Sequence, residues 1–167
     1  DEKLVKKAAS KAAPISVKWM HGLEAKDLTT EVTMLQRSLK NPFGADYQNY
    51  VFDDIKKQYD GDRGMVISGA TNNSGVLDFS IPTAKDESYP SMMLFNFQLR
   101  VFEKGGAFSN DMKAIKYSPY THYIGAKFPG GDNGSEIYVK DDEAIMLAAL
   151  NEDGRPENRT VTVTLTE

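Results

Sequence analysis

The sequence is poor in the residues that carry most protein chemistry: it has no cysteine, two histidines and one tryptophan. The absence of cysteine excludes disulfides, thiolate metal sites and cysteine nucleophiles. No apolar run reaches the roughly 18–20 residues that a membrane helix requires, and no signal-peptide pattern opens the chain. Because the chain begins Asp-Glu-Lys-Leu without an initiator methionine, we expect a piece of a longer protein whose targeting signal lies upstream.

A strong charge of one sign is also missing. The 24 acidic and 20 basic residues leave a net charge of −4, so no field attracts phosphate or anionic lipid, and we expect no nucleic-acid partner. Hydrophobic residues, in contrast, make up 40% of the chain and aromatic residues 10%. A chain of this size buries about 68–70% of its unfolded surface, which predicts a packed core.

Apolar residues alternate with polar ones along several short runs, as in strands with one buried face. Ile15–Trp19, Thr29–Leu35 and Met93–Glu103 show this period most clearly, and we expect Trp19 to be a core residue whose change to alanine costs roughly 3–5 kcal/mol. Further strands are predicted at Met65–Ser68, Val76–Ile81, Ala107–Ile115, Tyr138–Val139, Ala144–Leu150 and Thr160–Leu165.

Turn residues between these runs predict two hairpins. Gly69–Gly75, rich in Asn and Gly, is expected to join Met65–Ser68 to Val76–Ile81. Asn151–Gly154 is expected to turn Ala144–Leu150 back onto Thr160–Leu165. The long connection from Ser38 to Gly64 is expected to contain a short helix near Asp53–Gln58, with an aromatic loop, Phe43–Phe52, folded onto the sandwich.

Many short strands with turns between them predict an all-β immunoglobulin- or fibronectin-like β-sandwich. We expect residues 14–112 to form one complete sandwich and residues 113–167 part of a second, with a candidate boundary at Met112. Residues 1–13 are rich in lysine and alanine and have few apolar anchors, so they are expected to be a linker or lead-in.

Neither histidine has a histidine near it in sequence. For His21 and His122 a structural role is favoured over a ligand or a base, and for His122 that role is a partly buried polar aromatic. Asp60–Gly64 resembles the start of a calcium loop but lacks the later acidic ligands, so a solvated turn is favoured there, as it is at Asp132–Gly134 and Asp141–Glu143. We expect no catalytic residue, no metal ion, no cofactor and no enzyme activity.

Several tyrosines could lie exposed and bind a glycan or a protein, but a second packing layer over the sheets is favoured. The two readings differ in the geometry of Tyr47 and Tyr50: exposed, coplanar rings favour a binding surface, whereas burial on the sandwich favours a scaffold. The tyrosines concerned are Tyr47, Tyr50, Tyr117, Tyr120 and Tyr123.

Taken in order, residues 15–125 resemble bacterial α2-macroglobulin proteins. The likeness begins at Val17–Ala25 with a strand, a tryptophan, a glycine and a small residue. It continues through Val32–Met34, the aromatic loop Phe43–Phe52, the turn Thr71–Gly75, Arg100–Gly106 and Tyr117–Gly125. Ala144–Leu165 resembles the early strands of a next macroglobulin-like domain.

The resemblance implies one complete macroglobulin-like domain plus part of a second, acting as the framework of a large protease inhibitor of the cell envelope. Such a lipoprotein would be periplasmic or on the cell surface and would touch the membrane only through an upstream anchor. Its implied partners are neighbouring domains of the same chain and target proteases. The thioester centre of that family needs a cysteine, which this chain lacks.

Two other functions stay open at this point. One is an adhesin-type or glycan-binding immunoglobulin-like module that makes contact through Phe43–Phe52. The other is an accessory domain of an enzyme.

Overall fold

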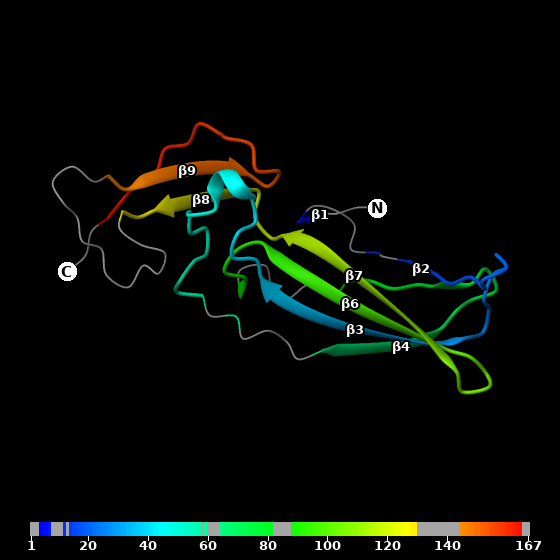
Figure 1. The fold of residues 1–167 in the computed structure, drawn as a ribbon. Helices are drawn as coiled ribbons and strands as arrows, with labels where there is room; N and C mark the ends of the chain where they lie inside the picture. The colour runs from blue at the N-terminus through cyan, green and yellow to red at the C-terminus, as the bar shows by residue number, and fades with distance from the viewer. Residues whose placement is uncertain are drawn as a thin grey trace.

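The computed structural model describes residues 4–7, 12, 14–57, 59, 64–81, 88–129 and 144–164. Over these residues the chain is nearly all β, with three sheets and one turn of 3-10 helix, η1 (Ala45–Tyr47), which confirms the predicted fold class (Figure 1). In chain order the strands are β1 (Leu4–Lys6), β2 (Ile15–Ser16), β3 (Thr29–Ser38), β4 (Met65–Ala70), β5 (Val76–Leu77), β6 (Met93–Phe102), β7 (Phe108–Ser118), β8 (His122–Lys127) and β9 (Met146–Asn151).

The main sheet has five strands in the order β1-β7-β6-β3-β4. Its centre is the antiparallel pair β3 and β6, which stays in register over ten residues, from Thr29 opposite Phe102 to Ser38 opposite Met93. A tight hairpin joins β6 to β7, closed by the hydrogen bond from Glu103 N–H to the Ala107 carbonyl at 2.8 Å. The sheet is thus built mainly from antiparallel neighbours, which short connections can join.

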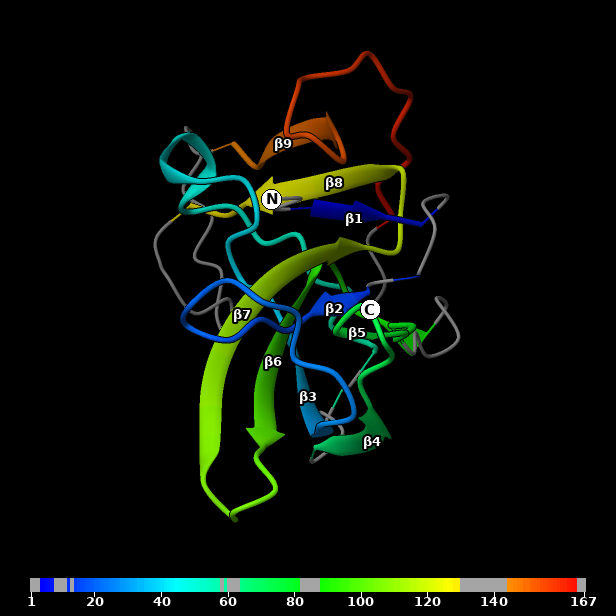
Figure 2. The ribbon, with the colours of Figure 1, turned by 90° about the vertical axis from the view of Figure 1, so that its right-hand side faces the viewer.

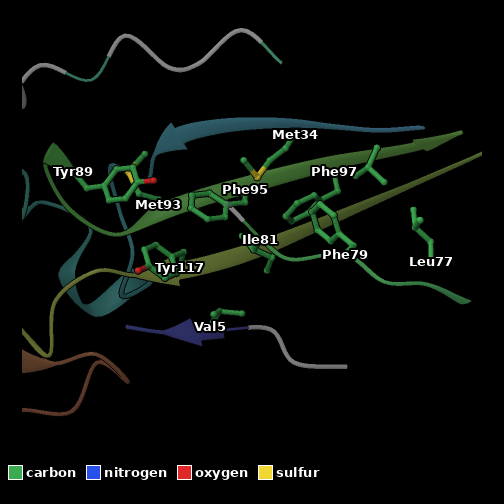
Figure 3. Packing of buried hydrophobic residues seen from close by; sticks show 11 residues of the cluster. Val5, Met34, Leu77, Phe79, Ile81, Tyr89, Met93, Phe95, Phe97 and Tyr117 are labelled. Carbon is green, nitrogen blue, oxygen red and sulfur yellow. The ribbon is translucent and has the colours of Figure 1, made fainter. Parts of the chain in front are cut away.

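The alternating runs bury the faces that the sequence predicts. Met93 and Phe95 of β6 have no exposed surface, and Thr30, Val32 and Met34 are buried along β3, on the strand that pairs with β6. The face is covered by the segment that follows β5 and by residues around Tyr89 (Figure 3). The resulting main core consists of Val5, Val32, Met34, Leu77, Phe79, Ile81, Tyr89, Met93, Phe95, Phe97 and Tyr117.

The second layer over this face is a small sheet of β2 and β5. Gly75 precedes β5 at a close approach: its φ is +69°, and a Cβ there would lie 2.6 Å from the Val17 carbonyl oxygen. The predicted hairpin across Gly69–Gly75 is wrong, because β4 and β5 belong to different sheets. The predicted turn does form, since Asn72 Oδ1 accepts the amides of Ser74 and Val76, but it carries the chain between layers.

The N-terminal stretch is not merely a lead-in. Leu4–Lys6 forms β1, which pairs in parallel with the end of β7, Val5 lying opposite Tyr117. Val5 is 5% exposed and belongs to the main core, and Leu4 packs against the cluster around Tyr123 and Leu150, so two apolar side chains anchor the strand. Lys6 extends the connection to the third sheet, where its Nζ lies 2.7 Å from Glu152 Oε1 and 3.0 Å from Asp153 Oδ1.

The third sheet pairs β8 with β9 at one end of the main sheet (Figures 1 and 2). Short flanking segments extend it on both sides: Val51 bridges to Ala126 of β8, and Pro156 bridges to Leu150 of β9. Tyr123 and Leu150 point to the inside and are buried. The opposite, outer face of the third sheet exposes Val51, Ile124 and Leu147 by 45%, 42% and 44%.

The predicted boundary at Met112 falls inside an unbroken strand. Pairing of β7 with β6 continues from Phe108 opposite Phe102 to Tyr117 opposite Met93. The change from the main sheet to the third sheet comes after Ser118, which ends β7. The break is therefore placed too early, whereas the division of the chain into two units stays a prediction.

Two further predictions of local structure are wrong. Asp54–Lys57 is a turn, with the Lys57 amide donating to the Asp54 carbonyl at 2.9 Å, instead of a helix. Thr160–Thr164 forms no strand. The predicted turn before it does form, since the Asn151 amide donates to the Arg155 carbonyl at 2.9 Å. The predicted strand at 138–139 lies outside the described residues.

Trp19 is half-buried, not a residue of the main core. It packs against Ala25, Leu28 and Val101 in a satellite cluster under the loop that follows β2. Because only part of the indole leaves water, we expect Trp19→Ala to cost about 1–2 kcal/mol, below the value for full burial of a large side chain. Urea denaturation would measure this; a loss above 3 kcal/mol would show that the indole packs more deeply.

Candidate functional site

Aromatic side chains gather where the main sheet meets the third sheet. This aromatic junction is anchored by Phe52 and Tyr123, which are 6% and 4% exposed. Phe43 packs edge-on against both, with ring centroids 4.8 Å from Phe52 and 5.2 Å from Tyr123. The junction consists of Phe43, Tyr47, Tyr50, Phe52, Tyr120 and Tyr123.

Tyr47 and Tyr50 test whether this junction is a binding surface. Both rings are half-buried against Phe52, with centroids at 6.1 and 6.2 Å, and they meet each other at an angle of 72°. A flat sugar-stacking platform requires exposed rings in one plane, whereas perpendicular rings are the ordinary packing of aromatic cores. The geometry therefore favours a packing layer over a glycan-binding face.

Hydroxyl groups fasten the junction to the main sheet. Ser118 Oγ, at the end of β7, lies 2.6 Å from the Tyr123 hydroxyl and 2.6 Å from the Tyr120 carbonyl. The Tyr120 hydroxyl donates to the Tyr89 carbonyl and accepts from Lys57 Nζ at 2.9 Å. Burial raises the pKa of Tyr123 to about 12, so its phenol stays protonated at neutral pH and serves as a hydrogen-bonding group instead of a base.

Asp53 is the carboxylate that the junction partly removes from water. Burial raises its pKa above the ordinary value of 3.8, against the opposing effects of the Ser91 and Ser38 hydroxyls and of Lys40. Among the described residues, its Oδ1 and the buried Ser91 Oγ have no hydrogen bond of acceptable geometry, and Ser38 Oγ lies at 3.4 Å from Oδ2. The charge is therefore poorly compensated.

Because the folded pKa of Asp53 is raised, its contribution to stability is present below the unfolded pKa and is lost as the pH rises through the folded value. We expect Asp53→Asn to raise the urea midpoint at pH 7 and to leave it nearly unchanged at pH 3. The exposed Asp78→Asn is the control and should move neither midpoint. A lower midpoint for Asp53→Asn at pH 7 would show that the carboxylate is stabilising.

The two histidines lie far apart in surroundings of different kinds. His21 is exposed on a hairpin tip, with its ring 6.5 Å from that of Trp19 and nearly parallel to it. His122 begins β8 and is exposed, instead of partly buried as predicted. Its Nδ1 lies 2.8 Å from Glu157 Oε2, and Arg159 Nη2 lies within hydrogen-bond distance of both that carboxylate and the imidazole.

Sequence reasoning missed this charged cluster of His122, Glu157 and Arg159, because the histidine lies more than thirty residues from its partners. The Arg159 guanidinium, with His122 as a smaller influence, lowers the pKa of Glu157. The described contacts of His122 are with the Glu157 carboxylate and the Arg159 guanidinium, and neither is a second imidazole or a nucleophile such as a serine. The cluster can hold the chain in place, but it carries no evident chemistry.

A hollow of about 260 Å³ opens where the small second layer leaves part of β7 uncovered. Its floor is apolar, with Val32, Phe79 and Phe97, and Asp111 stands on its wall. The Asp111 carboxylate accepts the Met112 amide at 2.8 Å and so caps one backbone group of β7. The wall groups do not form a catalytic constellation.

No group of three or more metal-ligating side chains occurs among the residues that the structure describes. The candidate calcium segments at 60–63, 132–134 and 141–143 lie outside those residues. In the same described part, no helix is long and apolar enough to cross a membrane. The absence of functional site residues therefore stays a prediction.

Comparison with known proteins gives matches in structure but none in sequence. No protein-family model and no curated protein matches the chain. The native alpha-2-macroglobulin of E. coli matches with a TM-score of 0.66 over 92% of this chain, at 12% identity. Salmonella alpha-2-macroglobulin reacted with methylamine matches at 0.61 over 89%, with 14% identity, and the trypsin-activated E. coli protein at 0.58 over 91%, with 13% identity.

The chain has the fold of a segment of bacterial alpha-2-macroglobulin. An identity of 12–14% shows the fold alone. The chain spans 10%, 9% and 12% of the three matched alpha-2-macroglobulin chains, so the fold recurs there as a small part of a much larger molecule. The match covers about nine-tenths of this chain, so it extends beyond the residues up to Ser118 that contain the main sheet.

Proposed function

We propose that this chain is a framework segment of a large, alpha-2-macroglobulin-like protease inhibitor of the bacterial cell envelope. The observation that carries the proposal is the match over 92% of the chain with a TM-score of 0.66 to one tenth of the native E. coli protein. A match that includes both the main sheet and the start of the third sheet supports a tandem of macroglobulin-like units. In this proposal the first unit is complete and the second is partial.

The contribution of this segment would be shape, not chemistry. The aromatic junction and the Lys6 ion pairs fix the third sheet against the main sheet. A protein that closes around a protease needs rigid units with set angles between them, and this junction supplies one such angle. The inhibitor would be periplasmic or on the cell surface, held by an upstream anchor, with proteases as its targets.

The test uses the complete gene product that contains these residues, mixed with trypsin or elastase. If the protein encloses the protease, hydrolysis of a large protein substrate falls steeply, whereas hydrolysis of a small peptide substrate is retained, because only the large substrate is kept out by size. Heat-denatured gene product is the control. Equal inhibition of both substrates, or none of either, would contradict the proposal.

A further inference from the structure

The last described stretch of the chain, Thr160–Thr164, has the sequence of a half-buried strand but lies in no sheet. Threonine alternates with valine, and the sequence continues the alternation through Leu165 and Thr166. Strict alternation of β-branched residues favours a strand. Yet Val163 is 70% exposed and Val161 37% exposed. No residue of this stretch forms a hydrogen bond in the described part of the chain.

The chain first approaches β9 and then leaves it. The Glu157 amide still donates to the Ala149 carbonyl at 2.9 Å, as in a third strand. Two residues later, Arg159 bonds to His122 at the beginning of β8. Figure 2 shows the following segment, in red, running down and away from β9. The charged cluster thus directs the stretch away from its nearest strand.

The outer face of the third sheet is a second apolar surface that stays partly exposed. Antiparallel pairing places Val51, Ala126 and Leu147 in one row across this face, and Ile124 and Ala149 in the next. Val51, Leu147 and Ile124 each expose between 42% and 45% of their surface. Such an apolar sheet face is ordinarily covered by another sheet at about 10 Å.

We propose that Thr160–Thr164 is a strand of a sheet whose other strands lie outside residues 1–167 of a longer protein, and that this sheet covers the outer face of the third sheet. The inference rests on the proposed function, since it needs the longer chain of which the matched structures are examples. The partner is the open edge strand of that sheet, which pairs with the backbone of Thr160–Thr164. Val161 and Val163 then belong to the apolar face of the extended sheet.

Amide hydrogen exchange tests the proposal by comparing the complete gene product with the chain of residues 1–167. In the complete product, alternate amides of Val161–Thr164, those whose N–H groups point to the partner strand, should exchange about a hundredfold more slowly or better. Such amides exchange only when the pairing opens by partial unfolding. In the shorter chain, held monomeric at micromolar concentration and checked by light scattering, they should exchange freely. The Glu157 amide, already bonded to β9, should be protected in both.

Two substitutions in the complete product separate pairing from mere proximity. Val163→Lys should make the protected amides exchange at least about tenfold faster, because it places a charge on an apolar face. Thr164→Lys, the same change one residue on, should leave protection intact, since it points to the opposite face.

Three results would overturn the inference: free exchange in the complete product, a gene product that ends at Glu167, or equal protection in the shorter chain. Equal protection in that chain would assign the pairing to another segment of the same chain if it is monomeric and to a second copy if it is dimeric. These results do not depend on protease inhibition. A complete product that traps no protease but protects Val161–Thr164 would therefore contradict the proposed function alone.

Discussion

Replacing Tyr117 by alanine should lower the free energy of unfolding by about 3–5 kcal/mol, the range for large aromatic side chains removed from a core. Tyr117 has no exposed surface, and its ring stacks on Phe95 with the centroids 5.2 Å apart (Figure 3). It also meets Tyr89 edge-on at 6.0 Å. Because β1 and β6 pair with the strand on either side, the backbone cannot collapse into the space left behind.

Urea denaturation would measure the loss, with Tyr117→Phe as the matched control. The phenylalanine variant removes only the hydroxyl and keeps the ring contacts with Phe95 and Tyr89, so it should lose much less than the alanine variant. An alanine variant that fails to fold agrees with the expectation, since small domains have only about 5–15 kcal/mol to lose. A loss below 1 kcal/mol for the alanine variant would contradict the assignment of Tyr117 to the core.

Gly125→Ala, a change of one methyl group, should destabilise the third sheet by about 1–3 kcal/mol, as overpacking does in a filled core. A Cβ at Gly125 would lie 2.4 Å from Cε1 and 2.5 Å from Cζ of Phe52. Phe52 cannot move aside, since Phe43 packs against it edge-on and Tyr47 and Tyr50 cover it. The strain outweighs the gain that alanine normally brings to a strand.

The control for this change is Gly105→Ala in the turn between β6 and β7, where a Cβ would meet nothing within 4 Å. Thermal unfolding followed by near-ultraviolet circular dichroism, which reports the aromatic junction, should show a lower midpoint for Gly125→Ala and an unchanged one for Gly105→Ala. Equal midpoints for the two variants would mean that Phe52 has room to shift.

The sequence predicts the long central strands because their alternation is uninterrupted and each buries one whole face. In β3 and β6 the period of two holds for ten residues, and the buried side is the predicted one. The strand at Ile15–Trp19 keeps the same alternation but shortens to two paired residues. Its partner β5 is equally short, so pairing ends although the pattern continues.

Pairing partners were harder to predict than strands. The turn at Asn72 predicts a reversal of the chain, but a reversal can join neighbours in one sheet or cross to another layer, and local sequence does not distinguish the two. The sequence does not predict β1, because three residues are too few to show a period. Its stability comes from Val5 and Leu4, which pack in clusters formed by distant segments. The predicted hairpin strand at Thr160–Thr164 does not form, because Arg159 bonds to His122 and the chain leaves β9 after that contact.

The candidate site shows the same limit. The tyrosines were correctly expected to form a packing layer, since many rings in a small protein most simply cover one another. The half-buried carboxylate of Asp53 and the charged cluster around His122 were missed, because each is assembled from segments distant in sequence. Contacts of that kind become visible only once the third sheet is placed.

The parallel pairing of β1 with β7 decides how the molecule would respond to a pull on its two ends. Leu4 lies opposite Lys116 and Lys6 opposite Ser118, so tension toward the N-terminus and tension along the chain after Ser118 act in opposite directions along adjacent strands. Such a load shears every bond between them together instead of opening them one by one. Because β1 has only three residues, we expect it to be the first strand to detach under such a load. When it detaches, Val5 leaves the core and the third sheet loses the Lys6 ion pairs.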